Sequence, residues 1–281
     1  MGTALAGALV GHGWDVVTCL RGRTPRTRAA AQAAGVTAAA TLVEAVATSD
    51  LVVSVVPQPA VLPTAEAFAA AVRGTGRRPV YLDANSVAPA TMAKVHEVVA
   101  SVDCACVDGA LVGSADLLGE KTRLYLSGSR AEDVATMLGD ALRVAVLGSE
   151  VGLASAFKLA FAGFNKGLVA LFLEVVMAVD RGGRRDELLE CLRAFYPGSV
   201  ETVERLLPSY PRHAARRVEE IDELAEWLVS VDQRGAMALG TKDVLARFVA
   251  LGLDAQGSWN AEQVLEACSR SGFLADVRRE P

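Results

Sequence analysis

Lys158 is the residue of this chain whose surroundings point most directly to chemistry. It lies in the apolar stretch "GLASAFKLAFAGFNKG" (152–167), which is predicted to form part of a long helix. A charged amine is costly to bury, so a lysine in such a helix ordinarily extends its ammonium group to the surface. In a ligand cleft, loss of water instead lowers the pKa of an amine and suits it to proton transfer near neutral pH. Lys158 is therefore a candidate catalytic residue, with a surface position as the alternative.

A set of arginines that follows a predicted strand is the second candidate feature. The stretch "DVVTCL" (15–20) has the β-branched residues of a strand, and "RGRTPRTR" comes directly after it. In dinucleotide-binding domains a carboxylate in this place accepts the ribose hydroxyls of NAD, and this stretch contains none. Arginines there favour the 2′-phosphate of NADP. Arg21 and Arg23 are the preferred phosphate ligands, whereas Arg26 and Arg28 fit a solvated helix start equally well.

Asn85 and Ser86 are polar residues at the end of another predicted strand, "RPVYLDAN" (78–85). Ligands of doubly wound sheets bind at the carboxyl ends of the strands, so both side chains are candidates for ligand contacts. The alternative is an Asx turn ahead of the helix that Pro89 begins. Asp108 is expected to cap a turn rather than to do chemistry.

The elements that must position these residues alternate between helix and strand up to about residue 150. The run "DLVVSVVP" (50–57) is continuously apolar, as in a fully buried parallel strand, and "TAEAFAAAVR" (64–73) follows as a helix. This alternation predicts a doubly wound parallel sheet, and so an α/β Rossmann-like domain over residues 1–150. Beyond it the apolar spacing is helical, and residues 151–281 are predicted to form an all-α domain.

The opening "MGTALAGALVGHGWDVVTCL" (1–20) begins as a helix of small residues and leads directly into a strand. A doubly wound domain normally has a strand in front of this helix. We therefore expect the first strand to be missing from the sequence as numbered. The natural gene product is expected to extend upstream by about ten residues that carry a β-branched strand and two glycines.

Composition argues against several classes of function. The 281 residues carry a formal net charge of −5, which argues against a general nucleic-acid-binding surface. The five cysteines are an odd number without a CxxC pair, which fits a reduced, cytoplasmic protein. His12, His96 and His213 have no carboxylate or cysteine at ligand spacing, so no metal site is expected.

Two apolar stretches resemble targeting or membrane segments, and neither is predicted to be one. No Lys or Arg precedes the apolar first dozen residues, and no small-residue cleavage site follows them. The stretch "LVALFLEVVMAV" (168–179) contains Glu174 and is shorter than the roughly 20 apolar residues of a membrane span. It is predicted to be a buried helix, and no membrane partner is expected.

Four stretches occur in an order that resembles the β-hydroxyacid dehydrogenase and 6-phosphogluconate dehydrogenase superfamily, which includes 3-hydroxyisobutyrate dehydrogenase. They are "SDLVVSVVPQPA" (49–60), "YLDANSVAPAT" (81–91), "VDGALVGSADLLGEKTRLYLSG" (107–128) and "GLASAFKLAFAGFNKG" (152–167). The opening "MG" resembles the end of the glycine turn of that superfamily. "RRVEEIDELAEWL" (216–228) and "MALGTKDVLARF" (237–248) are similar to the helical domain of phosphogluconate-dehydrogenase-like proteins.

The resemblance implies an NADP(H)-dependent oxidoreductase that acts on a small hydroxy acid or related carbonyl compound. Lys158 would be the catalytic proton donor or acceptor. The implied cofactor-binding residues are Met1, Gly2, Arg21, Arg23, Val56, Pro57, Asn85 and Lys242. The implied substrate-binding residues are Ser86, Gly113, Ser114, Asn165 and Lys166. It also implies a homodimer whose helical domains pack together, through an interface that the apolar face of residues 168–179 would suit.

Two departures from the family pattern leave the substrate open. Ala162 stands one turn after Lys158, where the family usually has Asn, and Val112 stands where it often has Ser. Asn165 and Lys166 lie two turns beyond Lys158 on the same helical face and could supply the missing polar contacts. The departures favour an imine reductase on the same fold as the alternative. A more distant alternative is a non-catalytic binding or scaffolding protein, because the leading glycines and first strand are absent.

Overall fold

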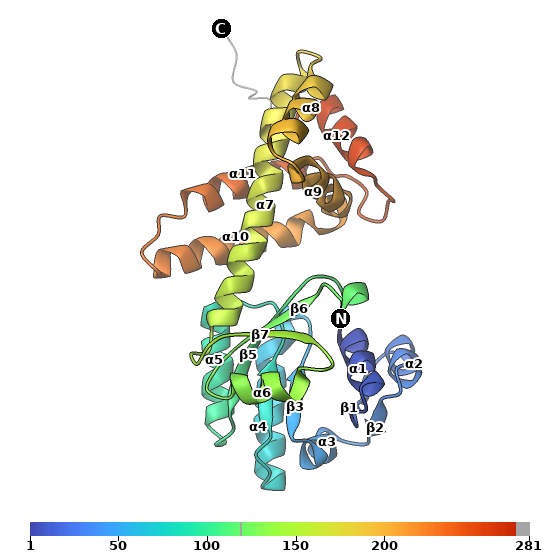
Figure 1. The fold of residues 1–281 in the computed structure, drawn as a ribbon, viewed down its shortest axis with the longest axis vertical. Coiled ribbons are helices and arrows are strands. Elements are labelled where there is room, and N and C mark those ends of the chain that lie inside the picture. The colour runs from blue at the N-terminus through green and yellow to red at the C-terminus, as the bar shows by residue number, and fades with distance from the viewer. Residues whose placement is uncertain (119, 274–281) are drawn as a thin grey trace. The chain divides into compact units, whose positions relative to one another are not determined.

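Two compact units make up the computed structural model, in which residues 1–118 and 120–273 are described (Figure 1). The first unit, Met1–Leu159, alternates helices and strands, and the regular elements described from Ala160 onward are helices. The predicted combination of an α/β domain and an all-α domain is therefore confirmed. The division between the units falls inside α7 (Leu153–Asp180) rather than at the predicted boundary after residue 150.

The strands described in the first unit form two separate sheets. The smaller sheet pairs β1 (Val17–Cys19) with β2 (Thr37–Ala39) in parallel. The larger sheet has the order β3-β4-β5-β6-β7, and its neighbours are parallel except for β5 and β6. Its strands are β3 (Leu51–Ser54), β4 (Val80–Asp83), β5 (Cys106–Val112), β6 (Arg123–Ser127) and β7 (Arg143–Gly148). β7 has no counterpart among the strands predicted from the sequence.

The two sheets are divided where the expected first strand would lie. In a doubly wound sheet, the first strand lies between the second strand in sequence and the fourth. Here β1 pairs with β2 and β3 pairs with β4, and between β1 and β3 no pairing occurs in the described residues. The doubly wound arrangement is thus present, with an open position for one further parallel strand.

Helices cover both faces of the larger sheet. α4 (Val61–Thr75) and α5 (Pro89–Ala100) pack on the face that carries Tyr81 and Cys106. α1 (Gly2–Gly11) and α6 (Ala131–Leu138) pack on the opposite face. The remaining helices of this unit are α2 (Pro25–Ala33), α3 (Leu42–Thr48) and the short η1 (Gln58–Ala60) and η2 (Ala115–Leu117).

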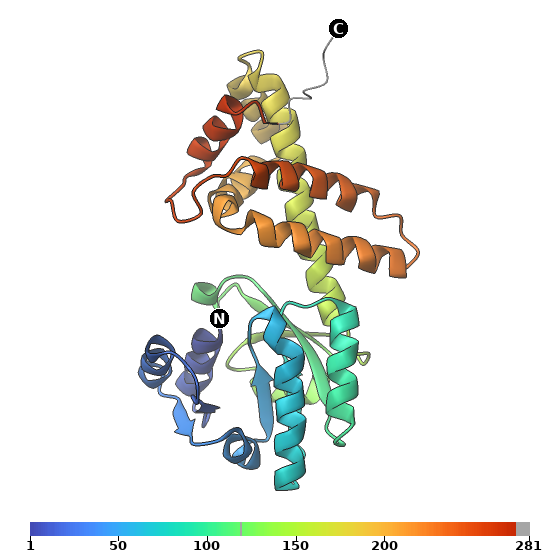
Figure 2. The same cartoon turned by 180° about the vertical axis from the view of Figure 1, so that it is seen from behind.

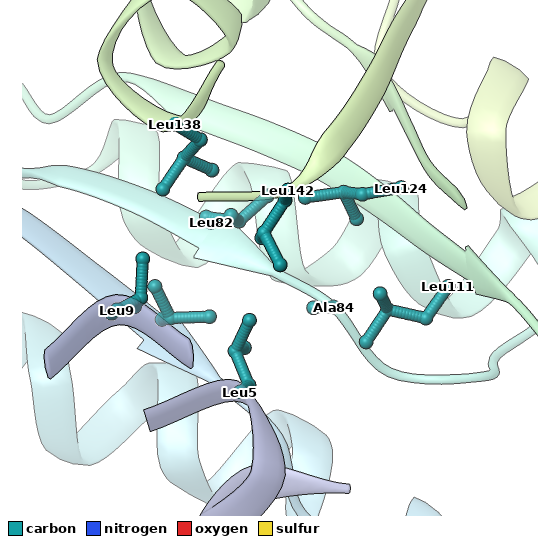
Figure 3. Close-up of a pocket in the computed structure, with 9 residues that line it drawn as sticks. Leu5, Leu9, Leu82, Ala84, Leu111, Leu124, Leu138 and Leu142 are labelled. Atoms are coloured by element: carbon teal, nitrogen blue, oxygen red, sulfur yellow. The ribbon is translucent and has the colours of Figure 1, made fainter. Parts of the chain in front are cut away.

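The core beneath α1 is apolar and tightly packed (Figure 3). Leu5 and Leu9 of α1 face Leu82, Leu124 and Leu138 across a space that leaves no room for a water molecule. Each of these leucines is at most 6% exposed. Burial of these apolar side chains therefore holds the small-residue helix at the start of the chain to the sheet.

The second unit is a set of helices that pack along α7. They are α8 (Arg185–Phe195), α9 (Ser199–Leu206), η3 (Leu207–Ser209), α10 (Tyr210–Ser230), α11 (Ala236–Ala250) and α12 (Ala261–Arg270). α10 and α11 run side by side as a helical hairpin (Figure 2). Gly163 lets α7 approach α10 closely, because a Cβ atom at this position would be 2.3 Å from Leu224 Cδ2.

α7 is the one helix among the described residues that is long and apolar enough to cross a membrane. It spans 28 residues. Of its apolar 18-residue stretch, 44% is buried inside the protein. The prediction of a buried helix holds for one side only. Leu173 and Val176 are fully buried, whereas Leu171 is 52% exposed and Val175 39%.

Candidate active site

A row of four buried polar residues crosses the larger sheet. Ser54 on β3 pairs with Asp83 on β4, which pairs with Asp108 on β5, which pairs with Ser127 on β6. All four are at most 4% exposed. We refer to Ser54, Asp83, Asp108 and Ser127 as the polar row. The chain then turns at the carboxyl ends of β3 and β4, where ligands bind in doubly wound sheets.

Asn85 attaches the loop after β3 to one half of the polar row. Its amide nitrogen donates to Ser54 Oγ and to Asp83 Oδ1, both at 2.9 Å. Its amide oxygen accepts a 2.6 Å hydrogen bond from the backbone N–H of Val56. The Asn85 side chain is 5% exposed and is engaged by the protein itself. It fixes the Val56–Pro57 segment, and direct contact between Asn85 and a cofactor stays a prediction.

The predicted cofactor residues at the chain start lie beside this segment. A Cβ atom on Gly2 would be 3.8 Å from Val55 Cβ, so α1 begins next to the end of β3. Met1, Gly2 and Pro57 are exposed, and Val56 is partly buried. The structure therefore brings together four residues that the sequence analysis assigned to cofactor binding.

Asp108 attaches the start of α7 to the other half of the polar row. Its carboxylate accepts hydrogen bonds from the backbone N–H groups of Gly152 (3.0 Å) and Ser155 (2.8 Å). It also accepts from Ser155 Oγ at 2.7 Å and from Ser127 Oγ at 3.3 Å, and Ser127 Oγ accepts from Ala154 N. A carboxylate at a helix N-terminus accepts hydrogen bonds from unpaired N–H groups, and its negative charge is stabilised by the positive end of the helix dipole. Asp108 thus caps a helix rather than a turn.

Lys158 lies one turn after Ser155 on the same helix. The packing of Phe157 against Tyr125 of β6, with ring centroids 4.4 Å apart, further fixes this turn. Lys158 itself is partly buried. The position of the candidate catalytic amine is therefore set by β5 and β6 through the first turn of α7.

The polar row carries two carboxylates whose pKa values are raised. Burial raises the pKa of Asp83 to about 6, against the opposing effect of its hydrogen bonds from Asn85. Burial likewise raises the pKa of Asp108, and the hydrogen bonds from Ser155 and Gly152 oppose the rise. Within the described part of the chain, Asp83 Oδ2 and the hydroxyl of Tyr81 are buried without a hydrogen-bond partner.

The polar row was missed in the sequence analysis, although the sequence contains a signal for it. Each of the four strands has two apolar residues followed by Ser or Asp, in "VVS" (52–54), "YLD" (81–83), "CVD" (106–108) and "YLS" (125–127). Repetition of this pattern at strand ends indicates a common register.

A groove of about 690 Å³ lies beside the smaller sheet and carries two arginines. Arg21, after β1, and Arg28, on α2, both line it, together with Gln32 and Thr41. The Arg28 Nε donates to the backbone oxygen of Arg23 at 3.2 Å. Arg23 does not line the groove. The two arginines on the groove are therefore Arg21, a preferred phosphate ligand, and Arg28, for which a solvated helix start was predicted equally. Arg21 and Arg28 give the lining of this groove a positive charge.

The segment predicted to hold a substrate carboxylate has a fixed backbone. Gly113 has φ +134°, and a Cβ atom there would be 2.2 Å from Thr122 Oγ1. Thr122 in turn donates to the backbone oxygen of Ser114 at 2.6 Å. Gly113, Ser114 and Ser86 are all exposed. This loop follows β5, the strand that carries Asp108.

The lysines predicted as ligand contacts in the second unit each have a carboxylate partner. Lys166 is 6% exposed, and its Nζ is 2.8 Å from Glu220 Oε2 on α10. Burial lowers the pKa of Lys166, and the Glu220 charge opposes that effect. Lys242 Nζ is 2.6 Å from Asp222 Oδ1. Both ion pairs hold helices of the second unit together, and the ligand roles of Lys166, Lys242 and the partly buried Asn165 stay predictions.

The described residues contain no group of three or more His, Cys, Asp or Glu side chains that could hold a metal ion. The first unit is an α/β unit that carries the polar row, the groove and the fixed loop, and a helical unit follows it. Comparison with known proteins gives the family. A model described as the NAD binding domain of 6-phosphogluconate dehydrogenase matches residues 1–144, and a domain of unknown function (DUF1932) matches residues 180–248.

Solved structures extend the similarity over most of the chain. A conserved protein of unknown function, described as structurally similar to 3-hydroxyacid dehydrogenases, is 31% identical, with 86% of this chain and 92% of that chain covered and a TM-score of 0.71. Mycobacterium tuberculosis 3-hydroxyisobutyrate dehydrogenase is 15% identical (95% and 94% covered, TM-score 0.74). Streptomyces aurantiacus imine reductase is 19% identical (94% and 95% covered, TM-score 0.54). The last two likenesses show the fold alone.

The chain belongs to the family defined by the NAD binding domain of 6-phosphogluconate dehydrogenase. Its first unit matches a nicotinamide-binding domain and its fold is that of the hydroxyacid dehydrogenases, so the predicted family assignment is confirmed.

Proposed function

We propose that the protein is an NADP(H)-dependent oxidoreductase that transfers a hydride between the nicotinamide and a small hydroxy acid or related carbonyl compound. The observation that carries the choice of NADP is the groove lined by Arg21 and Arg28. The residues after β1 include no carboxylate before Glu44 that could accept the ribose hydroxyls of NAD. Two guanidinium groups on one groove favour a 2′-phosphate through charge-assisted hydrogen bonds.

Titration of the protein with NADPH and with NADH tests this choice. NADPH is expected to bind at least about tenfold more tightly, which corresponds to about 1.4 kcal/mol. Arg21→Ala and Arg28→Ala should each remove most of that preference without weakening NADH binding. Arg26→Ala is the matched control, because Arg26 is an arginine of the same helix start that does not line the groove. Equal affinities for NADPH and NADH in the unmodified protein would refute the proposal.

Lys158 performs the proton transfer in this proposal. The bound nicotinamide supplies or accepts the hydride. The ammonium form of Lys158 donates a proton to the substrate oxygen during reduction, and the neutral amine accepts the hydroxyl proton during oxidation. Asp108 and Ser155 hold the helix turn that carries the amine. The fixed backbone at Gly113 and Ser114 offers N–H groups to a substrate carboxylate.

An imine reductase is the second candidate, and two residues favour it. Ala162 and Val112 both replace polar side chains that the hydroxyacid dehydrogenases usually have near the substrate. Loss of these groups suits a less polar substrate with a C=N bond. NADPH oxidation with a panel of cyclic imines, measured beside NADP reduction with a panel of hydroxy acids, separates the two. Binding of NADPH without turnover on either panel would favour the non-catalytic alternative.

The protein is further proposed to form a homodimer through one side of α7. Phe161, Phe164, Leu171 and Val175 are 39–70% exposed and are spaced by 3, 7 and 4 positions, a heptad-like stripe. Such a stripe pairs well with a second copy of itself about a twofold axis. Phe164→Glu should convert dimer to monomer in light scattering. Phe195→Glu, which changes a 75% exposed phenylalanine of α8, is the control.

A further inference from the structure

The polar row connects two segments that the proposed function needs at the same time. Its Ser54 and Asp83 half holds Asn85, and through it the N–H of Val56. Its Asp108 and Ser127 half holds the first turn of α7. The halves are adjacent, because Asp83 and Asp108 are direct partners across β4 and β5.

We propose that Asp83 and Asp108 are positioning residues. Together they hold the Val56–Pro57 segment and the α7 turn that carries Lys158 in a fixed position relative to each other, so that the catalytic amine is correctly placed against the bound cofactor. This inference rests on the proposed function. It goes beyond it in assigning catalytic consequences to two carboxylates that touch neither substrate nor cofactor.

The burial of the row shows that ordinary turn capping is not a sufficient explanation. Two carboxylates on neighbouring strands, each 1% exposed, repel one another and lose their hydration. A capping role alone is served at lower cost by Ser, Thr or Asn. Asp83 also keeps one oxygen, Oδ2, without a partner among the described residues, whereas Oδ1 accepts two hydrogen bonds from Asn85. Burial of the two carboxylates therefore lowers the stability of the fold. In return, their hydrogen bonds fix the positions of the Val56 segment and of the first turn of α7.

The two halves differ in what they should control. Val56 and Pro57 are predicted cofactor contacts and directly follow Val55, which lies beside Gly2. The Asn85 half should therefore affect cofactor binding and turnover together. The Asp108 half acts only on the α7 turn, so it should affect turnover and leave NADPH affinity unchanged. A row that merely stabilised the fold would lower the fraction of folded protein and leave both the NADPH Kd and the kcat per folded molecule unchanged.

Ser155→Ala is the central variant, because it removes one donor to Asp108 and leaves the backbone hydrogen bond in place. We expect kcat to fall by about tenfold or more, with the NADPH Kd unchanged within about twofold. Ser155→Thr retains the hydroxyl and should restore kcat. Asn85→Ala should instead raise the NADPH Kd and lower kcat. Met92→Leu, a change at a fully buried residue of α5 outside the row, is the control and should leave both constants unchanged.

Amide hydrogen exchange supplies a readout that does not depend on turnover. Asp108→Asn should speed exchange at Gly152, Ala154 and Ser155, and Asn85→Ala should speed exchange at Val56. The inference is overturned if Ser155→Ala leaves kcat and the exchange of α7 unchanged, or if Ser155→Thr fails to restore kcat. If the unmodified protein neither binds NADPH nor turns over substrate, the proposed function fails. The exchange pattern then still decides whether the row holds the two segments.

Discussion

Asp108 on β5 and Ser155 in the first turn of α7 are joined by two hydrogen bonds, at 2.7 and 2.8 Å, although 47 positions separate them in the chain. The carboxylate of a central strand thus caps the helix that carries Lys158. The start of α7 is therefore rigidly attached to β5. Loss of these hydrogen bonds is expected to change the position of the candidate catalytic amine of Lys158.

Replacement of Lys158 by Met tests its role in proton transfer. Met keeps the approximate length of the side chain and removes the amine. We expect kcat to fall by about a hundredfold or more, while the NADPH Kd stays close to normal. Normal turnover in this variant would remove Lys158 from the mechanism and would favour imine reduction with another proton donor.

Gly113 is expected to tolerate no side chain. Its φ of +134° is strained for any other residue, and a Cβ atom would be 2.8 Å from the Thr122 Cα as well as 2.2 Å from its Oγ1. Gly113→Ala should lower the free energy of unfolding by about 1–3 kcal/mol, measured by urea denaturation, and should raise the substrate KM. Ser114→Ala, at the neighbouring exposed position, should change stability by less than about 0.5 kcal/mol. Equal stabilities of the two variants would contradict this account of the loop.

Stability should depend on pH through Asp83. Its pKa rises from 3.8 to about 6 on folding, so between these values the folded protein retains a proton that the unfolded chain has released. The free energy of unfolding should therefore fall as the pH rises from about 4 to about 6. Asp83→Asn should flatten this slope, and the remainder in the same direction belongs to Asp108. Asp103→Asn, at a side chain that is 90% exposed, should leave the slope as it is. An unchanged slope in Asp83→Asn would show that Asp83 does not titrate in this range.

The open position between β1 and β3 predicts the effect of an added strand. A segment of about six β-branched residues followed by a glycine turn, fused ahead of Met1, should pair with both strands and raise Tm by several degrees, since each unmade buried hydrogen bond costs about 1–3 kcal/mol. NADPH should also bind more tightly, because the turn places N–H groups at the start of α1. A Gly/Ser extension of equal length is the control. No gain over that control in Tm or in NADPH affinity would refute the predicted pairing.

The fold was largely predictable because its elements follow simple patterns. The continuous apolar run that became β3 and the helical spacing after residue 150 gave the right classes of structure. β2 and β7 were missed. β2 (Thr37–Ala39) is only three residues long, and β7 (Arg143–Gly148) begins so soon after α6 (Ala131–Leu138) that the helix predicted there runs up to the start of the strand.

The candidate site was predictable only in part, because its geometry depends on register. The repeated strand-end pattern indicates a common register, but only the structure shows that Asp83 and Asp108 are direct partners. The choice of Arg28 over Arg23 depends on the direction in which a helix start presents its side chains. Burial of Lys166 could not be predicted from its own helix, because it depends on the packing of α10, which supplies Glu220.

The buried pair of Lys166 and Glu220 has a consequence for how this sequence can change over generations. Loss of Glu220 leaves the buried Lys166 charge uncompensated inside the helical unit, at a cost of about 3–5 kcal/mol, whereas two apolar residues in place of the pair are nearly neutral. A change from the ion pair to two apolar residues, made one substitution at a time, passes through a variant with only marginal folding stability. The two positions are therefore expected to vary together among descendants of this chain, and Lys166 should persist even in lineages that have lost the catalytic activity.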